Sequence, residues 1–228
     1  MVKLPKILVG CPVSDLKKYC TKEYINSVKS LTYPNYDILL VDNSKEPYFY
    51  NNLKQQGIPI IKDKYIEPAR ARIINSRNIL RQKVLENYDY FLSLEQDVIS
   101  PKDIIERLLA HNKDILTGVY YSYQTNNDVN LLTPLLWQFI NNDEVRYISN
   151  DEIQESKLMK VGACGLGCIL ISKKILEKIK FRYNPKSNCF DDMFFCLDAK
   201  NNNYDIYVDT SIKCKHLILK WNWNNIIK

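Results

Sequence analysis

The feature that most constrains the fold of this chain is a regular alternation of short apolar runs with helical segments over its first half. The runs KILVG (residues 6–10) and DILLVD (residues 37–42) have the length and composition of buried strands. Between them, the segment Thr21–Leu31 carries its apolar side chains on one helical face, with Thr21 as the N-cap residue. These segments predict a strand, a helix and a second strand.

The same alternation continues to about residue 115. Further predicted strands are PIIK (59–62) and YFLSL (90–94), and further predicted helices are PYFYNNLKQQ (47–56), Ala69–Asn87 and one that opens at Ser100 and Pro101 with Asp103 as its capping-box acid. This order predicts parallel strands joined by right-handed crossovers, and so an α/β fold with a doubly wound sheet. Such sheets bind ligands at the carboxyl ends of their strands.

The pattern changes after residue 121. A polar stretch interrupted by the apolar run LLTPLLWQFI precedes VGACGLGCILIS, and the helices become short. We expect an α+β second half that completes the sheet and covers the cleft. The prediction is therefore a single domain over residues 1–228, with halves of 1–120 and 121–228.

Charge and hydropathy limit the partners of the chain. The formal net charge is +6, but the lysines are interleaved with acids, which argues against a nucleic-acid-binding protein. A mild positive balance suits a polyanionic small substrate or, at most, peripheral contact with an anionic membrane. No window approaches the roughly 18 apolar residues of a membrane span, and MVKLPKILVG lacks the features of a signal peptide. We expect a cytoplasmic protein.

The seven cysteines are an odd number without a secreted context, and we expect mainly buried thiols. Disulfides inside a cell would be expected only in a hyperthermophile. Cys164 and Cys168, with Cys189, Cys196, Cys214 and His216 downstream, lack the C-x2-C spacing of a zinc knuckle. A structural zinc site is therefore the less favoured interpretation.

The glycines at 162, 165 and 167 run G-x-x-G-x-G into a strand. A dinucleotide-binding fingerprint has G-x-G-x-x-G opening a helix, so a Rossmann dehydrogenase is excluded. Two interpretations stay open at this turn. The glycines form a bend without a ligand, or they let the backbone approach a substrate closely.

Acidic residues follow two of the predicted strands. Asp42 comes at the end of DILLVD, and Glu95 and Asp97 follow YFLSL in the tripeptide EQD. Residues i and i+2 of an extended strand end point the same way, so Glu95 and Asp97 can share a target such as Mg²⁺ or Mn²⁺. The alternative is a solvated acidic turn before a helix.

The second half adds two further features, FDDMFFCLDAK with Asp191 and Asp192 at a predicted helix start, and KHL with His216 at a strand end. Paired acids at a helix start are usually caps, and a lone histidine is usually a surface or core residue. Neither feature identifies a site by itself.

Taken in order, CPVSD, VDNS, SRN, LEQD, GLGCILISKKILEKIKF, FDDMFFCLDAK and KHL resemble a GT-A glycosyltransferase of the family 2 type. The resemblance covers nearly the whole chain. It implies the GT-A (nucleotide-diphospho-sugar transferase) fold, with a nucleotide-binding half at 1–120 and an acceptor-side catalytic half at 121–228. It also implies a hexosyltransferase with an Mn²⁺ or Mg²⁺ cofactor.

The resemblance implies roles for single residues. Asp42 matches the acid that contacts the nucleotide base or ribose, and Arg77 and Asn78 match an R-N pair near the nucleotide. Glu95 and Asp97 match the two acids of the D-x-D motif, with Asp97 as the direct metal ligand and Glu95 as a further nucleotide or metal contact. In the second half, Asp191 and Asp192 match an E-D pair whose second acid is the catalytic base, and His216 matches a histidine that completes the metal site.

The chain departs from the family pattern in several places. The usual D-D-G-S is VDNS, the first D-x-D acid is Glu95, and Phe194 stands where a second acid is common. There is also no Q-x-x-R-W motif near the C-terminus. A processive polymer synthase with a membrane channel is therefore not expected.

The expected reaction is an inverting transfer of one sugar from a nucleotide-diphosphate sugar to a hydroxyl of a glycan, glycolipid or protein. Two alternatives stay open. One is a nucleotidyltransferase, although CPVSDLKKY lacks its phosphate loop, and the other is a catalytically silent sugar-nucleotide-binding module. The C-terminal tail with Trp221 and Trp223 is expected either to pack on the domain or to contact the acceptor.

Overall fold

The structure is a computed structural model that describes residues 4–126, 129–141, 144–155, 157–187 and 189–218 of the 228-residue chain. Trp221 and Trp223 lie outside the described residues. The first half contains the elements β1 (Ile7–Val13), η1 (Asp15–Cys20), α1 (Thr21–Lys29), β2 (Tyr36–Asp42), α2 (Tyr48–Gln55), β3 (Ile60–Lys62), α3 (Ala69–Asn87), β4 (Tyr90–Leu94), β5 (Val98–Ile99), α4 (Ile104–Ala110) and β6 (Ile115–Val119).

The second half is richer in short strands. It contains β7 (Tyr121–Asn126), β8 (Val129–Pro134), β9 (Leu136–Phe139), β10 (Val145–Tyr147), η2 (Asp151–Ile153), β11 (Leu158–Val161), β12 (Ala163–Cys164), β13 (Cys168–Ser172), α5 (Lys173–Lys178), α6 (Asp191–Asn201), β14 (Ile206–Lys213) and β15 (Lys215–His216). This composition confirms the predicted α+β second half.

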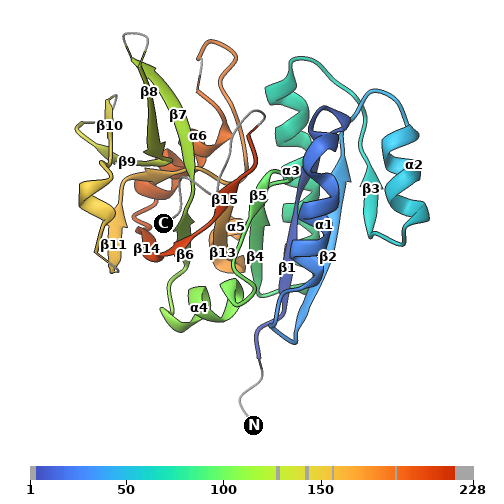
Figure 1. Cartoon of the computed structure of the whole chain (residues 1–228), viewed down its shortest axis with the longest axis horizontal. Helices are drawn as coiled ribbons and strands as arrows, with labels where there is room; N and C mark the ends of the chain where they lie inside the picture. Colours follow the sequence, from blue (N-terminus) through green and yellow to red (C-terminus); the bar gives the residue numbers. More distant parts are fainter. Residues whose placement is uncertain (1–3, 127–128, 142–143, 156, 188, 219–228) are drawn as a thin grey trace.

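Within the described residues, eight strands form one central sheet in the order β11-β14-β6-β13-β4-β1-β2-β3, which Figure 1 shows from left to right. The neighbours β3, β2, β1 and β4 are parallel, as are β6 and β14. In contrast, β13 is antiparallel to β4 and β6, and β11 is antiparallel to β14. Strands from both halves of the sequence therefore share one mostly parallel sheet, as predicted.

Helices cover both faces of this sheet. One buried cluster joins apolar residues of α3, α5 and α6, including Leu80, Leu176 and Phe195. The other joins residues of α1, α2 and α4, including Tyr24 and Leu53. Successive residues of β1 alternate between the two clusters, because neighbouring side chains of a strand point to opposite faces. The sheet is therefore doubly wound.

The register of the parallel strands brings their carboxyl ends to one edge of the sheet. Val13 of β1 pairs with Asp42 of β2, and Gly10 of β1 pairs with Ser93 of β4. The loop after β1, the VDNS segment and the EQD turn consequently leave the sheet on the same side. This alignment brings the acidic segments at the ends of β2 and β4 to the same edge of the sheet, as predicted.

The helix predicted to open at Ser100 and Pro101 begins later. The helix α4 starts at Ile104, and the side chain of its N-cap residue, Asp103, makes no capping hydrogen bond, so the predicted capping box is wrong. The strand β5 ends at Ile99, and its antiparallel pair with β15 holds the chain extended just before the predicted start.

In the part of the chain that the structure describes, no helix combines the length and the apolar character that crossing a bilayer requires. Among the helices of the described residues, α3 is the longest, and it carries several charged residues along its length.

Candidate active site

Two cavities adjoin at the carboxyl edge of the sheet. The first cavity lies between the loop after β1, Asn43 and the start of α3, and the second lies between Tyr120, the start of α6 and His216. Their linings share Lys17, Ile73, Arg77 and Glu95. A ligand that lies along the edge of the sheet could therefore occupy both.

The EQD turn forms the boundary between these cavities. The chain leaves β4 at Leu94, and the backbone N–H of Glu95 donates to the carbonyl of Gly167, 3.0 Å away. The N–H of Val98 then donates to the carbonyl of Glu95 at 2.8 Å, which closes the turn. EQD is therefore a tight turn and not an extended strand end as predicted.

Gln96 holds this turn against the loop after β1. Its side chain is buried, with Oε1 accepting from the N–H of Ser14 at 2.9 Å. Its Nε2 donates to the carbonyl of Lys17 at 3.1 Å and to Oγ1 of Thr21 at 2.8 Å. Through Gln96, the sequence CPVSDLKKY and the EQD turn are fixed relative to each other.

Asp97 faces a histidine from the far end of the described chain. The short pairing of β15 with β5 aligns His216 with Val98, and Nε2 of His216 lies 3.3 Å from Oδ2 of Asp97. The Nδ1 of His216 donates to the carbonyl of Tyr121 at 2.7 Å, which leaves Nε2 as the ring nitrogen with a lone pair when the ring is neutral. The structure thus brings two predicted metal ligands together.

Lys17 binds the same carboxylate, with Nζ 2.8 Å from Oδ2 of Asp97. Burial acts to raise the pKa of Asp97, but the hydrogen bond from the protonated His216 ring and the charge of Lys17 outweigh it and lower this pKa to about 2. The carboxylate is therefore ionised at neutral pH. Its other oxygen, Oδ1, is buried and makes no hydrogen bond within the described residues.

Arg77 connects the two cavities through the middle of the site. Its guanidinium is buried, forms ion pairs with Glu95 and with Asp191 (Nε to Oδ2, 2.5 Å), and donates to Oγ of Ser93 at 3.1 Å. The Ser93 hydroxyl donates in turn to the carbonyl of Leu166 at 2.7 Å. Arg77 therefore joins α3 to the EQD turn and to the first residue of α6.

The two acids at the start of α6 have different environments. Both line the second cavity, where Asp191 is buried against Arg77 and Asp192 is half-buried. Burial raises the pKa of Asp192 to about 6, and the negative charge of Asp191 adds to the shift. One oxygen of Asp192 accepts from the N–H of Met193 at 2.7 Å. Asp192 is thus suited to take up a proton near neutral pH.

The Gly-rich turn makes room for the ring of Tyr120. A Cβ added at Gly165 would lie 2.0 Å from the Tyr120 hydroxyl, and one at Gly167 would lie 2.6 Å from its ring. That hydroxyl accepts from the N–H of Gly167 at 2.8 Å, and the ring meets His216 edge-on at 5.4 Å between centroids. Gly165 and Gly167 thus allow close packing of Tyr120 inside the protein, and the approach of this backbone to a substrate stays a prediction.

Two predicted site residues lie apart from this group. Asp42 is fully buried, where it accepts from Ser44 and pairs with Lys62 at 2.8 Å, and its neighbour Asn43 lines the first cavity instead. Asn78 donates to the carbonyl of Phe181 at 2.9 Å and lines neither cavity. Contact between Asp42 and a nucleotide stays a prediction that requires Lys62 to move.

The thiols match the expectation of buried cysteines, with Cys189 as the exposed exception. The Cys214 thiol donates to Sγ of Cys168 at 3.4 Å, and both cysteines are free thiols without a disulfide. No three His, Cys, Asp or Glu side chains of the described segments converge in a group that could hold a metal ion.

The donor set therefore offers a metal ion two protein ligands, not three. Asp97 contributes a carboxylate with a free buried oxygen, and His216 contributes Nε2. Glu95 is turned to Arg77 and is not part of this pair. Two such ligands fit a cation of the Mg²⁺ or Mn²⁺ type, which is commonly held by one or two carboxylates together with substrate oxygens.

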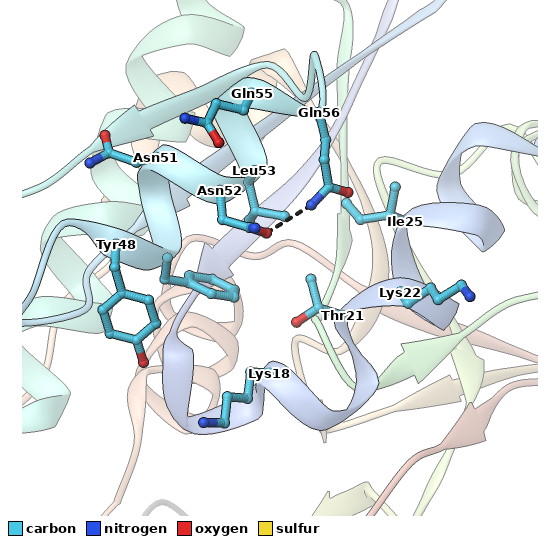
Figure 2. A pocket seen from close by; sticks show the side chains of 11 residues that line it. Lys18, Thr21, Lys22, Ile25, Tyr48, Asn51, Asn52, Leu53, Gln55 and Gln56 are labelled. Atoms are coloured by element: carbon cyan, nitrogen blue, oxygen red, sulfur yellow. Dashed lines mark hydrogen bonds between the residues drawn. The ribbon is translucent and has the colours of Figure 1, made fainter.

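A third cavity lies between α1 and α2 and contains none of the predicted site residues. Lys18, Lys22 and Tyr48 line it together with amide side chains, and Figure 2 shows the hydrogen bond from Gln56 to Asn52 at the C-terminal end of α2. No carboxylate lines this cavity, so the chemistry of the predicted site is confined to the first two.

Sequence reasoning missed Lys17 and Gln96. Both stand in predicted motifs, Lys17 in CPVSDLKKY and Gln96 in the middle of EQD. Their roles depend on a contact between these motifs that no local pattern reveals. The amide of Gln96 between two acids is the one signal that could have indicated a residue that binds the EQD turn to another loop.

The comparisons with known proteins identify the family and the fold of the chain. Glycosyl transferase family 2 matches residues 20–180 of the chain. No curated protein shows a significant sequence match. A solved structure of GalNAc-T7 with UDP, GalNAc and Mn²⁺ is similar at 11% identity with a TM-score of 0.71, covering 97% of this chain and 46% of that chain.

The structure of S. aureus TarS is similar at 15% identity with a TM-score of 0.60, covering 93% of this chain and 37% of that chain. TarS 1-349 in complex with UDP gives 16% identity and a TM-score of 0.57, covering 92% and 60%. The chain thus spans less than two thirds of each of these proteins. At such identities the similarity shows a shared fold, while the family match covers most of the chain. The chain belongs to glycosyl transferase family 2 and is a glycosyltransferase with the GT-A fold.

Proposed function

We propose that the chain transfers a single sugar from a nucleotide-diphosphate sugar to an acceptor hydroxyl, with inversion at the anomeric carbon and with the help of a divalent metal ion. One observation carries this proposal. A single cavity is lined by both Asp192, a carboxylate whose pKa is raised to about 6, and His216, the partner of Asp97.

Asp192 is the general base of the proposed reaction. Its carboxylate takes the proton of the acceptor hydroxyl as the oxygen attacks the anomeric carbon, and the bond to the diphosphate breaks. Direct displacement by the acceptor from the opposite side gives inversion. Asp191 pairs with Arg77 and holds the start of α6 in place.

The charges of the site favour a divalent cation beside the diphosphate. Carboxylates outnumber permanent cations here, with Glu95, Asp97, Asp191 and Asp192 on one side and Lys17, Arg72 and Arg77 on the other. A nucleotide diphosphate would add more negative charge, which the protein's own cations could not neutralise. Asp97 and His216 would hold the metal, which neutralises the charge that develops on the departing diphosphate.

The two cavities suggest how the substrates lie. The nucleotide would occupy the first cavity, in the half at 1–120, and the acceptor would approach through the second, in the half at 121–228. UDP is the first nucleotide to test, because GalNAc-T7 and S. aureus TarS were both solved with UDP. The diphosphate would then lie between Lys17 and Arg77, which line both cavities.

The test is a panel of nucleotide-diphosphate sugars incubated with the purified chain and Mn²⁺ or Mg²⁺, with release of the nucleotide diphosphate as the readout. Metal-dependent release, with the acceptor product of inverted configuration by NMR, is the expected result. Release of the nucleotide diphosphate that is unchanged in EDTA would contradict the proposed metal dependence. A product of retained configuration would contradict the direct displacement. Binding of sugar nucleotides without any turnover across acceptors would favour a silent module.

A further inference from the structure

The Lys17 side chain places a positive charge beside Asp97, the carboxylate that is proposed to bind the metal ion. Its ammonium lies 2.8 Å from Oδ2 of Asp97, the oxygen that His216 faces at 3.3 Å, and its side chain lines both cavities. In this structure a lysine of the chain neutralises the carboxylate proposed as the metal ligand.

The backbone of Lys17 is fixed to the same turn that carries Asp97. Its carbonyl accepts hydrogen bonds from Gln96 at 3.1 Å and from the Cys20 thiol at 3.1 Å. Lys17 also has non-helical dihedral angles inside η1 (φ −104°, ψ 23°), so the helix is kinked at this residue. The fold therefore fixes the backbone from which the Lys17 side chain reaches Asp97, although that side chain is 41% exposed.

The Lys17 side chain reaches Asp97 through its terminal ammonium. A lysine has a long flexible stem and can withdraw without moving the backbone. The ammonium can thus leave Asp97 while the backbone carbonyl of Lys17 stays hydrogen-bonded to Gln96.

We propose that Lys17 competes with the divalent metal for Asp97, so that the metal binds well only when a nucleotide diphosphate draws the ammonium away. This inference rests on the proposed function. Without nucleotide, Lys17 occupies Asp97 and metal affinity is low. With nucleotide, the diphosphate offers the ammonium a second anion and offers the metal further oxygen ligands. Lys17 is in this sense a positioning residue that couples donor binding to metal binding.

Such coupling is reciprocal and can be measured without any turnover. If UDP tightens Mn²⁺ binding by some factor, Mn²⁺ must tighten UDP binding by the same factor. The metal-stripped full chain is titrated with Mn²⁺, with and without saturating UDP, and bound ion is followed by electron paramagnetic resonance. Binding of Mn²⁺ to UDP itself is measured without protein and subtracted.

The test variant is Lys17→Met, which keeps most of the stem and removes the charge. The matched control is Lys18→Met, because Lys18 lines the separate cavity between α1 and α2 (Figure 2). A charge-assisted hydrogen bond contributes about 1.5–3 kcal/mol, which corresponds to about a tenfold to hundredfold change in affinity. Thermal unfolding of each variant shows that the fold is retained, and Lys17→Gln serves as a second neutral variant.

The expected result is that Lys17→Met binds Mn²⁺ at least about tenfold more tightly than wild type in the absence of UDP, with a correspondingly smaller gain on adding UDP. Lys18→Met should behave as wild type. Unchanged Mn²⁺ affinity in both neutral variants at position 17 overturns the inference, whether or not wild type binds metal. Wild type that binds no Mn²⁺ even with UDP contradicts the proposed metal-dependent function, whereas a gain in Lys17→Met in that case still supports the competition.

Discussion

The Nε atom of Arg77 lies 2.5 Å from Oδ2 of Asp191, and this ion pair joins the middle of α3 to the first residue of α6. Both side chains are buried, with 3% and 6% of their surface exposed. Paired acids at a helix start are usually caps, but the N-cap residue of α6 is Phe190, which makes no side-chain capping bond, and Asp191 is the first residue of the helix. The acid serves instead to fix the helix that carries Asp192.

Replacing Asp191 with Asn should therefore destabilise the fold. Loss of one partner of a buried ion pair costs about 3–5 kcal/mol, and the remaining pair of Arg77 with Glu95 should hold the loss to the lower end. The measurement is urea denaturation. The control is Asp198→Asn on the same helix, whose pair with Arg182 is more exposed and should change stability by less than about 1 kcal/mol. Equal losses in the two variants would contradict this role of Asp191.

Replacing Asp192 with Asn should abolish the proton acceptor while keeping the shape of the side chain. We expect the transfer rate to fall by about 10²–10⁴-fold, with UDP affinity within about twofold of wild type. Rates come from single-turnover assays with saturating acceptor, and UDP affinity comes from calorimetry. A wild-type rate in this variant would remove Asp192 from the mechanism.

The pH profile of transfer should report the same carboxyl group. Because burial raises the pKa of Asp192 to about 6, the base is ionised above that pH and protonated below it. The rate should be constant near pH 7–8 and fall about tenfold per pH unit well below the pKa. In Asp192→Asn this acidic limb should disappear. An acidic limb that persists in the variant would have to come from another group.

The metal ligands can be separated by substitution. Asp97→Ala should abolish binding of Mn²⁺ in the presence of UDP, because it removes the carboxylate with the free buried oxygen. His216→Ala should weaken that binding more mildly. Glu95→Gln is the comparison, and it should leave Mn²⁺ affinity nearly unchanged because Glu95 is paired with Arg77. A loss of metal in Glu95→Gln as large as in Asp97→Ala would restore Glu95 as a direct ligand.

The packing of the Gly-rich turn on Tyr120 gives a further test. Gly165→Ala should lower the free energy of unfolding by about 1–3 kcal/mol, since its Cβ would lie 2.0 Å from the Tyr120 hydroxyl. Thermal and urea denaturation measure the change. In a Tyr120→Phe background the hydroxyl is gone, and the same substitution should cost less. Equal costs in the two backgrounds would show that the backbone, and not the hydroxyl, limits the space.

The sequence predicts elements with a clear period and misses contacts between distant segments. The alternation that defines β1 to β4 and α1 to α3 is local, because strand and helix periods are visible within a short window. Two other contacts are not local, because each joins segments far apart in the chain: the pairing of β5 with β15, and the ion pair of Lys17 with Asp97. Asp97 and His216 were predicted through a family resemblance, and only the two-residue strand β15 explains their contact.

The environment of Asp42 shows another limit of sequence reasoning. An acid at the end of a rim strand predicts a ligand contact, yet Asp42 is enclosed by Ser44 and Lys62. Neither partner is recognisable from spacing. Ser44 follows two residues later, and Lys62 comes from the neighbouring strand β3.

The shared guanidinium of Arg77 also restricts how this chain could evolve. Loss of Arg77 alone would leave Asp191 and Glu95 as neighbouring unpaired carboxylates, and loss of either acid alone would leave part of a buried positive charge uncompensated. Tolerated exchanges at these three positions should therefore occur together, and sequences descended from a common ancestor with this chain should show correlated variation at 77, 95 and 191.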